Sequence, residues 1–136
     1  MSMELELQIG NTHAEYTPAR DRLVAFFEES GVTPDTVGEL ELILEEVLVN
    51  VISYAYGDGQ GEILITARVD GGAVVLEFCD HGAPFNPLEQ ETPDLDASVD
   101  ERPIGGLGVF LVTQLASRVD YERRDESNVL TVVKSL

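Results

Sequence analysis

The stretch ILEEVLVNVISYAYGDG, from Ile43 to Gly59, has the spacing of an amphipathic helix but carries polar residues beside an almost unbroken apolar run. Glu46 and Asn50 are four residues apart, so on a helix they lie on one face, about one turn from each other. This spacing lets a carboxylate reach a proton while an amide oxygen reaches a metal ion. Asn in a helix interior costs about 0.5 kcal/mol relative to Ala, and a functional role would account for it. An ordinary solvated helix face is the alternative.

The composition is that of one globular, soluble domain. The chain has 136 residues, of which 43% are apolar, so a single domain over residues 1–136 can bury a real core. No apolar run approaches the roughly 20 residues of a membrane helix. The first ten residues lack the pattern of a signal peptide, and Cys79 is the single cysteine. We therefore expect a cytoplasmic protein.

The net charge is strongly negative. Twenty-six acidic residues against eight basic ones give −18 at pH 7. This balance argues against nucleic acid or an anionic membrane as a direct partner. Solubility alone would explain the acidic surface, and a basic partner protein is the sharper alternative.

Hydrophobic spacing and turn residues predict alternating helices and hairpins. Thr17-Pro18 and Thr33-Pro34 resemble helix starts, and Gly31 resembles a helix stop. The predicted order is strand 3–9, helix 17–29, helix 33–56, strands 62–69 and 73–80, a long loop 81–106, helix 107–117, and a closing hairpin 118–136 that turns at Glu126-Ser127. Strands that pair mostly as hairpins, with helices between them, predict an α+β layer of helices on a largely antiparallel sheet.

Two further stretches carry candidate chemistry. In DHGAPFNP, Asp80 ends an apolar strand and can accept a hydrogen bond from an exocyclic amine, while Gly82 lets a flat ring approach the backbone. In PIGGLGVFLV, from Pro103 to Val112, glycines at a helix start free backbone N–H groups for an anion. Each stretch taken alone could be an ordinary turn or helix start.

Taken together and in this order, EEVLVNVISYAY, DHGAPFNP and GGLGVFLV resemble the N, G1 and G2 boxes of the GHKL (Bergerat-fold) ATP-binding superfamily. They are most similar to those of the anti-sigma-factor serine/threonine kinases. The resemblance covers nearly the whole chain, from the first helix to the closing VLTVVKSL strand. It implies a single ATP-binding domain that is a two-layer α/β sandwich, with a mostly antiparallel mixed sheet, helices on one face, and ATP and Mg²⁺ as cofactors.

The resemblance also implies residue roles. Asn50 falls on the position that coordinates Mg²⁺ and Glu46 on the general base for the attacking hydroxyl, with Glu45 about 100° round the helix. Asp80 falls on the residue that binds the adenine amino group, with Gly82 beneath the base. The segment from about Leu88 to Arg102 would form a flexible lid over the nucleotide. The residues that the resemblance places at the phosphates are Gly105, Gly106, Leu107 and Gly108. Arg102 is not part of the family pattern, but we expect it to contact the phosphates because most of its neighbours are acidic.

The chain departs from the family pattern in one respect. Many relatives carry a Gly-Thr pair before the last strand, whereas Ser127 and Asn128 stand here. In addition, no phospho-accepting histidine box is visible, because His13 and His81 lie outside any dimerisation-helix pattern. A two-component histidine kinase is therefore not expected.

The function implied is an ATP-dependent serine/threonine kinase that phosphorylates a STAS-domain anti-anti-sigma protein and sequesters a sigma factor or a similar regulator. Relatives of this type often act as homodimers. Two alternatives remain open at this stage. One is a module that binds ATP without phosphotransfer, and the other is an interaction domain whose glycines are purely conformational.

Overall fold

The computed structural model describes residues 2–54, 61–84, 86–89 and 106–136. In chain order these residues form β1 (Ser2–Gly10), α1 (His13–Glu29), α2 (Pro34–Tyr54), β2 (Glu62–Asp70), β3 (Ala73–Asp80), the 3-10 helix η1 (Pro87–Glu89), α3 (Gly106–Leu115), β4 (Arg118–Arg124) and β5 (Ser127–Ser135). None of the described helices has both the length and the apolar character needed to cross a membrane.

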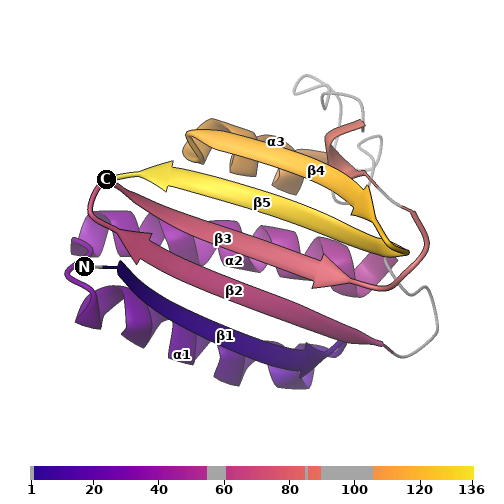
Figure 1. Ribbon diagram of the computed structural model, residues 1–136, viewed down its shortest axis with the longest axis horizontal. Coiled ribbons are helices and arrows are strands. Elements are labelled where there is room, and N and C mark those ends of the chain that lie inside the picture. The colour runs from indigo at the N-terminus through magenta and orange to yellow at the C-terminus, as the bar shows by residue number, and fades with distance from the viewer. Residues whose placement is uncertain (1, 55–60, 85, 90–105) are drawn as a thin grey trace.

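The described strands form one sheet in the order β1-β2-β3-β5-β4, and each neighbouring pair is antiparallel. The α-helices all lie on the same face of this sheet (Figure 1). The predicted α+β class and its two-layer arrangement are confirmed. The pairs β2–β3 and β4–β5 are hairpins, and the pairs β1–β2 and β3–β5 join strands that are separated by helices. The described strands therefore contain no parallel pair.

The core forms where the apolar stripe of α2 meets the inward face of the central strands. Along β3, alternate residues are buried, ending with Phe78 and Asp80. Helical spacing predicts that α2 turns seven apolar residues to the core, and all are buried except the half-buried Val51: Leu40, Ile43, Leu44, Val47, Leu48, Val51 and Ile52. Burial of each such side chain contributes roughly 1.5–3 kcal/mol. Because buried and less buried residues alternate along β3, Asp80 lies at the end of its buried face, directly opposite Asn128 of β5.

The start of α1 differs from the prediction. Thr17 was expected as the N-cap and Pro18 in the first turn, but Thr12 precedes the helix and Pro18 lies inside it. Tyr16 and Ala19 continue the buried stripe of α1 toward its N-terminus. Their burial compensates for the single backbone hydrogen bond that Pro18 cannot donate.

The end of α1 agrees with the prediction that Gly31 stops the helix. Gly31 has a φ of 85°. Its N–H donates to the carbonyl of Glu28 at 3.1 Å, and the N–H of Val32 donates to the carbonyl of Phe27 at 3.1 Å. This pair of bonds is a Schellman motif, which requires a left-handed residue at the glycine position.

The last hairpin turns one residue earlier than expected. The turn residues are Asp125 and Glu126, with φ values of 50° and 66°, rather than Glu126 and Ser127. Two positive φ values are the geometry of a type I′ turn, whose twist matches that of the flanking strands. As a result, Ser127 and Asn128 both belong to β5. Residues 55 and 56 of the predicted second helix lie outside the described residues.

Candidate functional site

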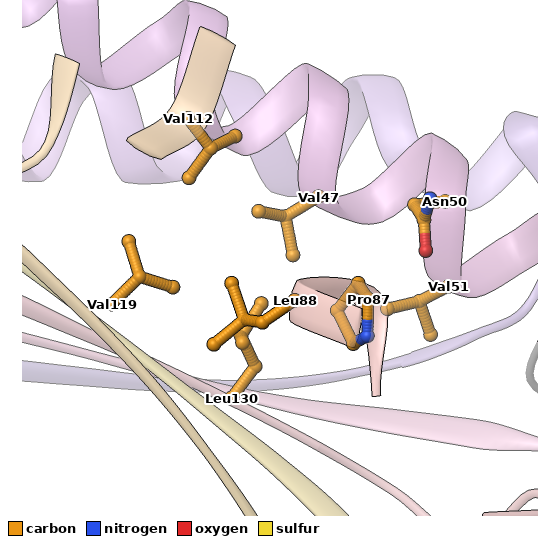
Figure 2. A pocket seen from close by; sticks show the side chains of 8 residues that line it. All are labelled: Val47, Asn50, Val51, Pro87, Leu88, Val112, Val119 and Leu130. Atoms are coloured by element: carbon orange, nitrogen blue, oxygen red, sulfur yellow. The ribbon is translucent and has the colours of Figure 1, made fainter. Parts of the chain in front are cut away.

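A cleft lies between the helical layer and the β4–β5 end of the sheet. Its apolar part is lined by α2, η1, α3, β4 and β5 (Figure 2): Val47, Asn50, Val51, Pro87, Leu88, Val112, Val119 and Leu130. A second hollow shares four of these residues and adds Phe78, Asp80, Tyr121 and Asn128. The cleft is therefore apolar in its first part and has convergent polar groups in its second, as is typical of small-molecule sites.

The α3 wall of this cleft is anchored by Lys134 of β5. Its Nζ donates a hydrogen bond of 2.7 Å to the carbonyl of Leu115, at the C-terminus of α3. The same ammonium group forms an ion pair with Glu39 of α2. A cation at this position also interacts favourably with the helix dipole. These contacts hold Val112 of α3 opposite α2.

Asp80 lines the second hollow of the cleft, and its two carboxylate oxygens differ in their contacts. Its side chain is buried, and Oδ1 accepts hydrogen bonds from the backbone N–H of Gly82 and from Nδ2 of Asn128, both at 2.9 Å. Within the part of the chain that the structure describes, Oδ2 accepts no hydrogen bond. An ionised carboxylate oxygen in an apolar cleft is a strong acceptor, so Oδ2 can bind an amine donor of a ligand.

Asn128 connects Asp80 to the β4–β5 hairpin. Its Nδ2 also donates to the carbonyl of Ala83 at 2.8 Å, and its Oδ1 accepts a hydrogen bond of 2.6 Å from the hydroxyl of Tyr121. Sequence reasoning left the role of Asn128 open and missed Tyr121. The signal that could have found them is the alternation of β4 and β5, which puts both residues on the inward face.

The turn that follows Asp80 is held by two further contacts. Arg123 of β4 donates from a guanidinium nitrogen to the carbonyl of Gly82 at 2.8 Å. Nδ1 of His81 lies 2.7 Å from Oγ of Ser127. Because β4 and β5 both contribute, the turn between Asp80 and Ala83 is positioned by the hairpin rather than by its own residues alone.

Asn50 is buried at the cleft without a hydrogen-bond partner for its amide nitrogen. The residue is 5% exposed, and Nδ2 contacts no acceptor in the described residues. Figure 2 shows the side chain leaving α2 on the side of Val51 and Pro87. An unpaired buried amide group costs roughly 1–3 kcal/mol. Such a residue is expected to gain its partners from a ligand.

Glu46 lies one turn before Asn50 on α2 and is half-buried. Burial raises the pKa of Glu46, and the negative charge of Glu45 raises it further. A carboxylate with a raised pKa is a stronger base. Glu46 is not among the residues that line the two hollows of the cleft.

Two of the predicted phosphate residues, Arg102 and Gly105, lie outside the described residues, as does the predicted lid beyond Glu89. Gly106, Leu107 and Gly108 form the first turn of α3, which confirms the predicted helix start there. Asn50 and Asp80, predicted from separate motifs, line the same cleft.

Comparison with known proteins identifies one domain family. The family model described as the histidine kinase-like ATPase domain matches residues 9–134. The chain is 34% identical over 94 residues to the serine/threonine-protein kinase BtrW of Bordetella bronchiseptica, covering 68% of this chain and 66% of that protein, just under two thirds. It is 23% identical over 127 residues to the anti-sigma F factor of Bacillus licheniformis, covering 93% of this chain and 87% of that protein.

Solved structures share the fold. A crystal structure of the RsbU and RsbW domains of a Mycobacterium tuberculosis protein has a TM-score of 0.69 at 15% identity, covering 97% of this chain and 32% of that chain. One chain of the SiaB–SiaC complex from Pseudomonas aeruginosa has a TM-score of 0.56 at 14% identity, covering 96% of this chain and 89% of that chain. At these identities the likeness is one of fold.

Proposed function

The chain belongs to the histidine kinase-like ATPase family, and from this premise we propose that it is an ATP-dependent protein serine/threonine kinase of the anti-sigma-factor type. Members of this family are ATP-binding domains, and the relatives include proteins named as serine kinases and anti-sigma factors. The observation that carries the proposal is the convergence of Asn50 from α2 and Asp80 from β3 on one cleft.

In this proposal Asp80 and its neighbours bind adenine. Oδ2 of Asp80 accepts a hydrogen bond from the exocyclic amine, and Gly82 keeps the backbone beside the ring free of a side chain. The ring itself packs against the apolar lining that Val51, Pro87 and Leu130 provide. Exclusion of water from this lining strengthens the polar contact at Asp80.

Asn50 is the proposed protein ligand of Mg²⁺. Its Oδ1 would be the ligand, because an amide oxygen is a hard donor and Mg²⁺ in nucleotide sites takes few protein ligands beside phosphates and water. The unpaired Nδ2 would donate a hydrogen bond to an oxygen of the ligand. When bound, Mg²⁺ would supply charge neutralisation for the transferring phosphoryl group. The phosphates themselves would lie at the start of α3, where Gly106 and Gly108 offer backbone N–H groups to an anion.

Glu46 is the proposed general base. It would accept the proton of a serine or threonine hydroxyl while that oxygen bonds to the γ-phosphorus and the bond to the bridging oxygen of ADP breaks. The raised pKa of Glu46 suits this task. Such in-line transfer depends mainly on positioning and charge neutralisation.

The proposed substrate is a serine of a STAS-domain anti-anti-sigma protein, and the proposed sequestered partner is a sigma factor or a similar regulator in the cytoplasm. The relatives' names support this reading, and the SiaB–SiaC complex offers a structural parallel for partner binding. A homodimer is proposed separately, from the resemblance to the anti-sigma-factor kinases.

Phosphotransfer from labelled Mg-ATP to candidate STAS-domain proteins tests the proposal. Glu46→Gln should retain ATP binding and lose transfer by about 100-fold or more. Glu28→Gln, at an exposed position on α1, is the matched control and should transfer at close to the wild-type rate. ATP binding with no phosphorylated serine on any candidate would favour the second function, an ATP-binding module without transfer.

A further inference from the structure

The contact between Asp80 and Asn128 is built by the sheet itself. The two residues are register partners on β3 and β5, both face the helical layer, and each is 5% exposed. Asn128 donates from Nδ2 to Oδ1 of Asp80 at 2.9 Å and to the carbonyl of Ala83 at 2.8 Å. Forty-eight residues of chain separate the two partners, so the contact depends on the fold and not on a local turn.

The orientation of the Asn128 amide is unambiguous. Both groups that face Nδ2, a carboxylate and a carbonyl, can only accept hydrogen bonds. The hydroxyl of Tyr121 lies 2.6 Å from Oδ1 and donates to it. A flipped amide would set its oxygen against two acceptors, so Asp80 and Ala83 together fix Asn128 as a donor, and Tyr121 holds this orientation by donating to Oδ1.

This orientation decides which atom of Asp80 faces a ligand. Oδ1 already accepts two hydrogen bonds, from Gly82 and from Asn128. Oδ2 is then the oxygen left for the cleft, and an ionised carboxylate offers an acceptor but no donor. Such an oxygen favours a purine with an amino group at position 6 and disfavours one with an oxo group there, because two acceptors would face each other.

We propose that Asn128, oriented by Tyr121, is a positioning residue that sets the preference of the site for 6-amino over 6-oxo purine nucleotides by holding Asp80 with Oδ2 toward the base. The inference rests on the proposed function, since it takes the cleft to bind a purine nucleotide. Where the family pattern has a threonine, with one hydroxyl donor, this chain has an amide that donates to Asp80 and Ala83 at once.

Equilibrium binding of Mg-ATP and Mg-ITP to the full chain tests this proposal. ITP differs from ATP in carrying an oxo group in place of the 6-amino group. The wild-type chain should prefer ATP by roughly tenfold or more. Asn128→Ala should weaken ATP binding roughly tenfold and reduce the ATP-to-ITP preference several-fold, because Asp80 loses the contact that fixes its rotamer.

Two further variants sharpen the test. Asn128→Asp replaces the amide donor with a carboxylate that faces Oδ1 of Asp80, so the contact that holds Asp80 is lost and two like charges are set side by side; ATP binding and the ATP-to-ITP preference should fall at least as far as in Asn128→Ala. Tyr121→Phe leaves the Asn128 side chain in place but removes the hydroxyl that orients it, and should lower the preference by a smaller factor. Thr131→Val, on the opposite face of β5, is the control.

The ratio of the ATP affinity to the ITP affinity shows whether Asn128 positions Asp80 or only stabilises the fold. A residue that only stabilised the fold would change ATP and ITP binding by the same factor, so an unchanged ratio in Asn128→Ala and Tyr121→Phe would overturn the inference. If Asn128→Ala fails to fold, the ratio in Tyr121→Phe alone decides. A wild-type chain that binds ATP and ITP equally would overturn the inference but leave the proposed function intact, whereas one that binds neither would overturn both.

Discussion

Glu46 combines a proposed catalytic role with an electrostatic cost to stability. Its folded-state pKa lies above that of an unfolded glutamate because of burial and the nearby Glu45. The stability that this shift contributes is fully present below the unfolded pKa and is lost as the pH rises through the folded pKa. At neutral pH the wild-type chain therefore carries an unfavourably placed charge at this position.

We expect Glu46→Gln to gain thermal stability relative to the wild type as the pH rises from about 4 to about 7. The glutamine is neutral throughout this pH range, so the variant does not lose the folding stability that the wild type loses when Glu46 ionises. Thermal unfolding followed by circular dichroism at several pH values measures the difference. Glu28→Gln, exposed on α1, controls for the change in net charge. A Glu46→Gln variant whose relative stability falls with rising pH would contradict the raised pKa.

Asn50 and Asn128 allow the same substitution to be compared at two buried positions. Asn50→Leu removes an amide nitrogen without a partner and should stabilise the nucleotide-free protein by about 1 kcal/mol. Asn128→Leu removes an amide that makes at least three hydrogen bonds, and should destabilise the protein by about 2 kcal/mol or more. Urea unfolding measures both. Equal destabilisation by the two variants would mean that Asn50 is satisfied in the free protein.

Single residues were predictable where a short motif carried them. Asn50, Asp80 and Gly82 belong to contiguous stretches, and the cleft contains or adjoins all three. Tyr121 and Asn128 carry no motif. Their contacts depend on the register of β5 against β3 and β4. Because the turn was expected one residue too late, at Glu126-Ser127, the face of β5 on which Asn128 lies could not be assigned from the sequence.

At the scale of elements, glycines at two positions have opposite consequences for helix stability. Gly31 has a φ of 85° at the end of α1, so Gly31→Ala should lower stability by roughly 1 kcal/mol. Gly38 lies inside α2, and a Cβ there would meet nothing within 4 Å. Gly38→Ala should therefore raise stability by up to about 1 kcal/mol. Guanidinium unfolding of the two variants checks this, and a shift of the same sign in both would refute the helix-end assignment.

Elements with strong periodicity were predicted well, and those that depend on tertiary burial were not. The apolar stripe of α2 and the alternation of β2 and β3 are local signals, and the structure confirms them. The start of α1 was misplaced because Pro18 is a strong local signal for a first turn. The burial of Tyr16 and Ala19, which extends the helix, is a property of the packed molecule.

At the scale of the whole molecule, the net charge of −18 bears on partner choice. If the proposed sigma-like partner presents a basic surface, association should weaken by tenfold or more as salt is raised from about 50 to about 300 mM, mainly through a slower on-rate. Surface plasmon resonance at increasing salt measures this. A complex whose affinity does not respond to salt would exclude charge complementarity as its basis.

The two-layer fold brings together segments that lie far apart in the chain. α2, β3 and the β4–β5 hairpin all contribute to the cleft, and Lys134 holds α3 beside them. The order of the motifs predicted this convergence through the family resemblance. Composition and periodicity alone predicted only helices layered on a sheet.

We propose that Asp80 and Asn50 bind opposite ends of one Mg-ATP molecule. Calorimetric titration with adenosine and with Mg-ATP tests these two roles in one experiment. Asp80→Asn should weaken binding of both ligands by roughly tenfold or more, whereas Asn50→Ala should weaken Mg-ATP by a similar factor and leave adenosine unchanged. A wild-type chain that binds neither ligand, or variants that bind both as tightly as the wild type does, would contradict the claim.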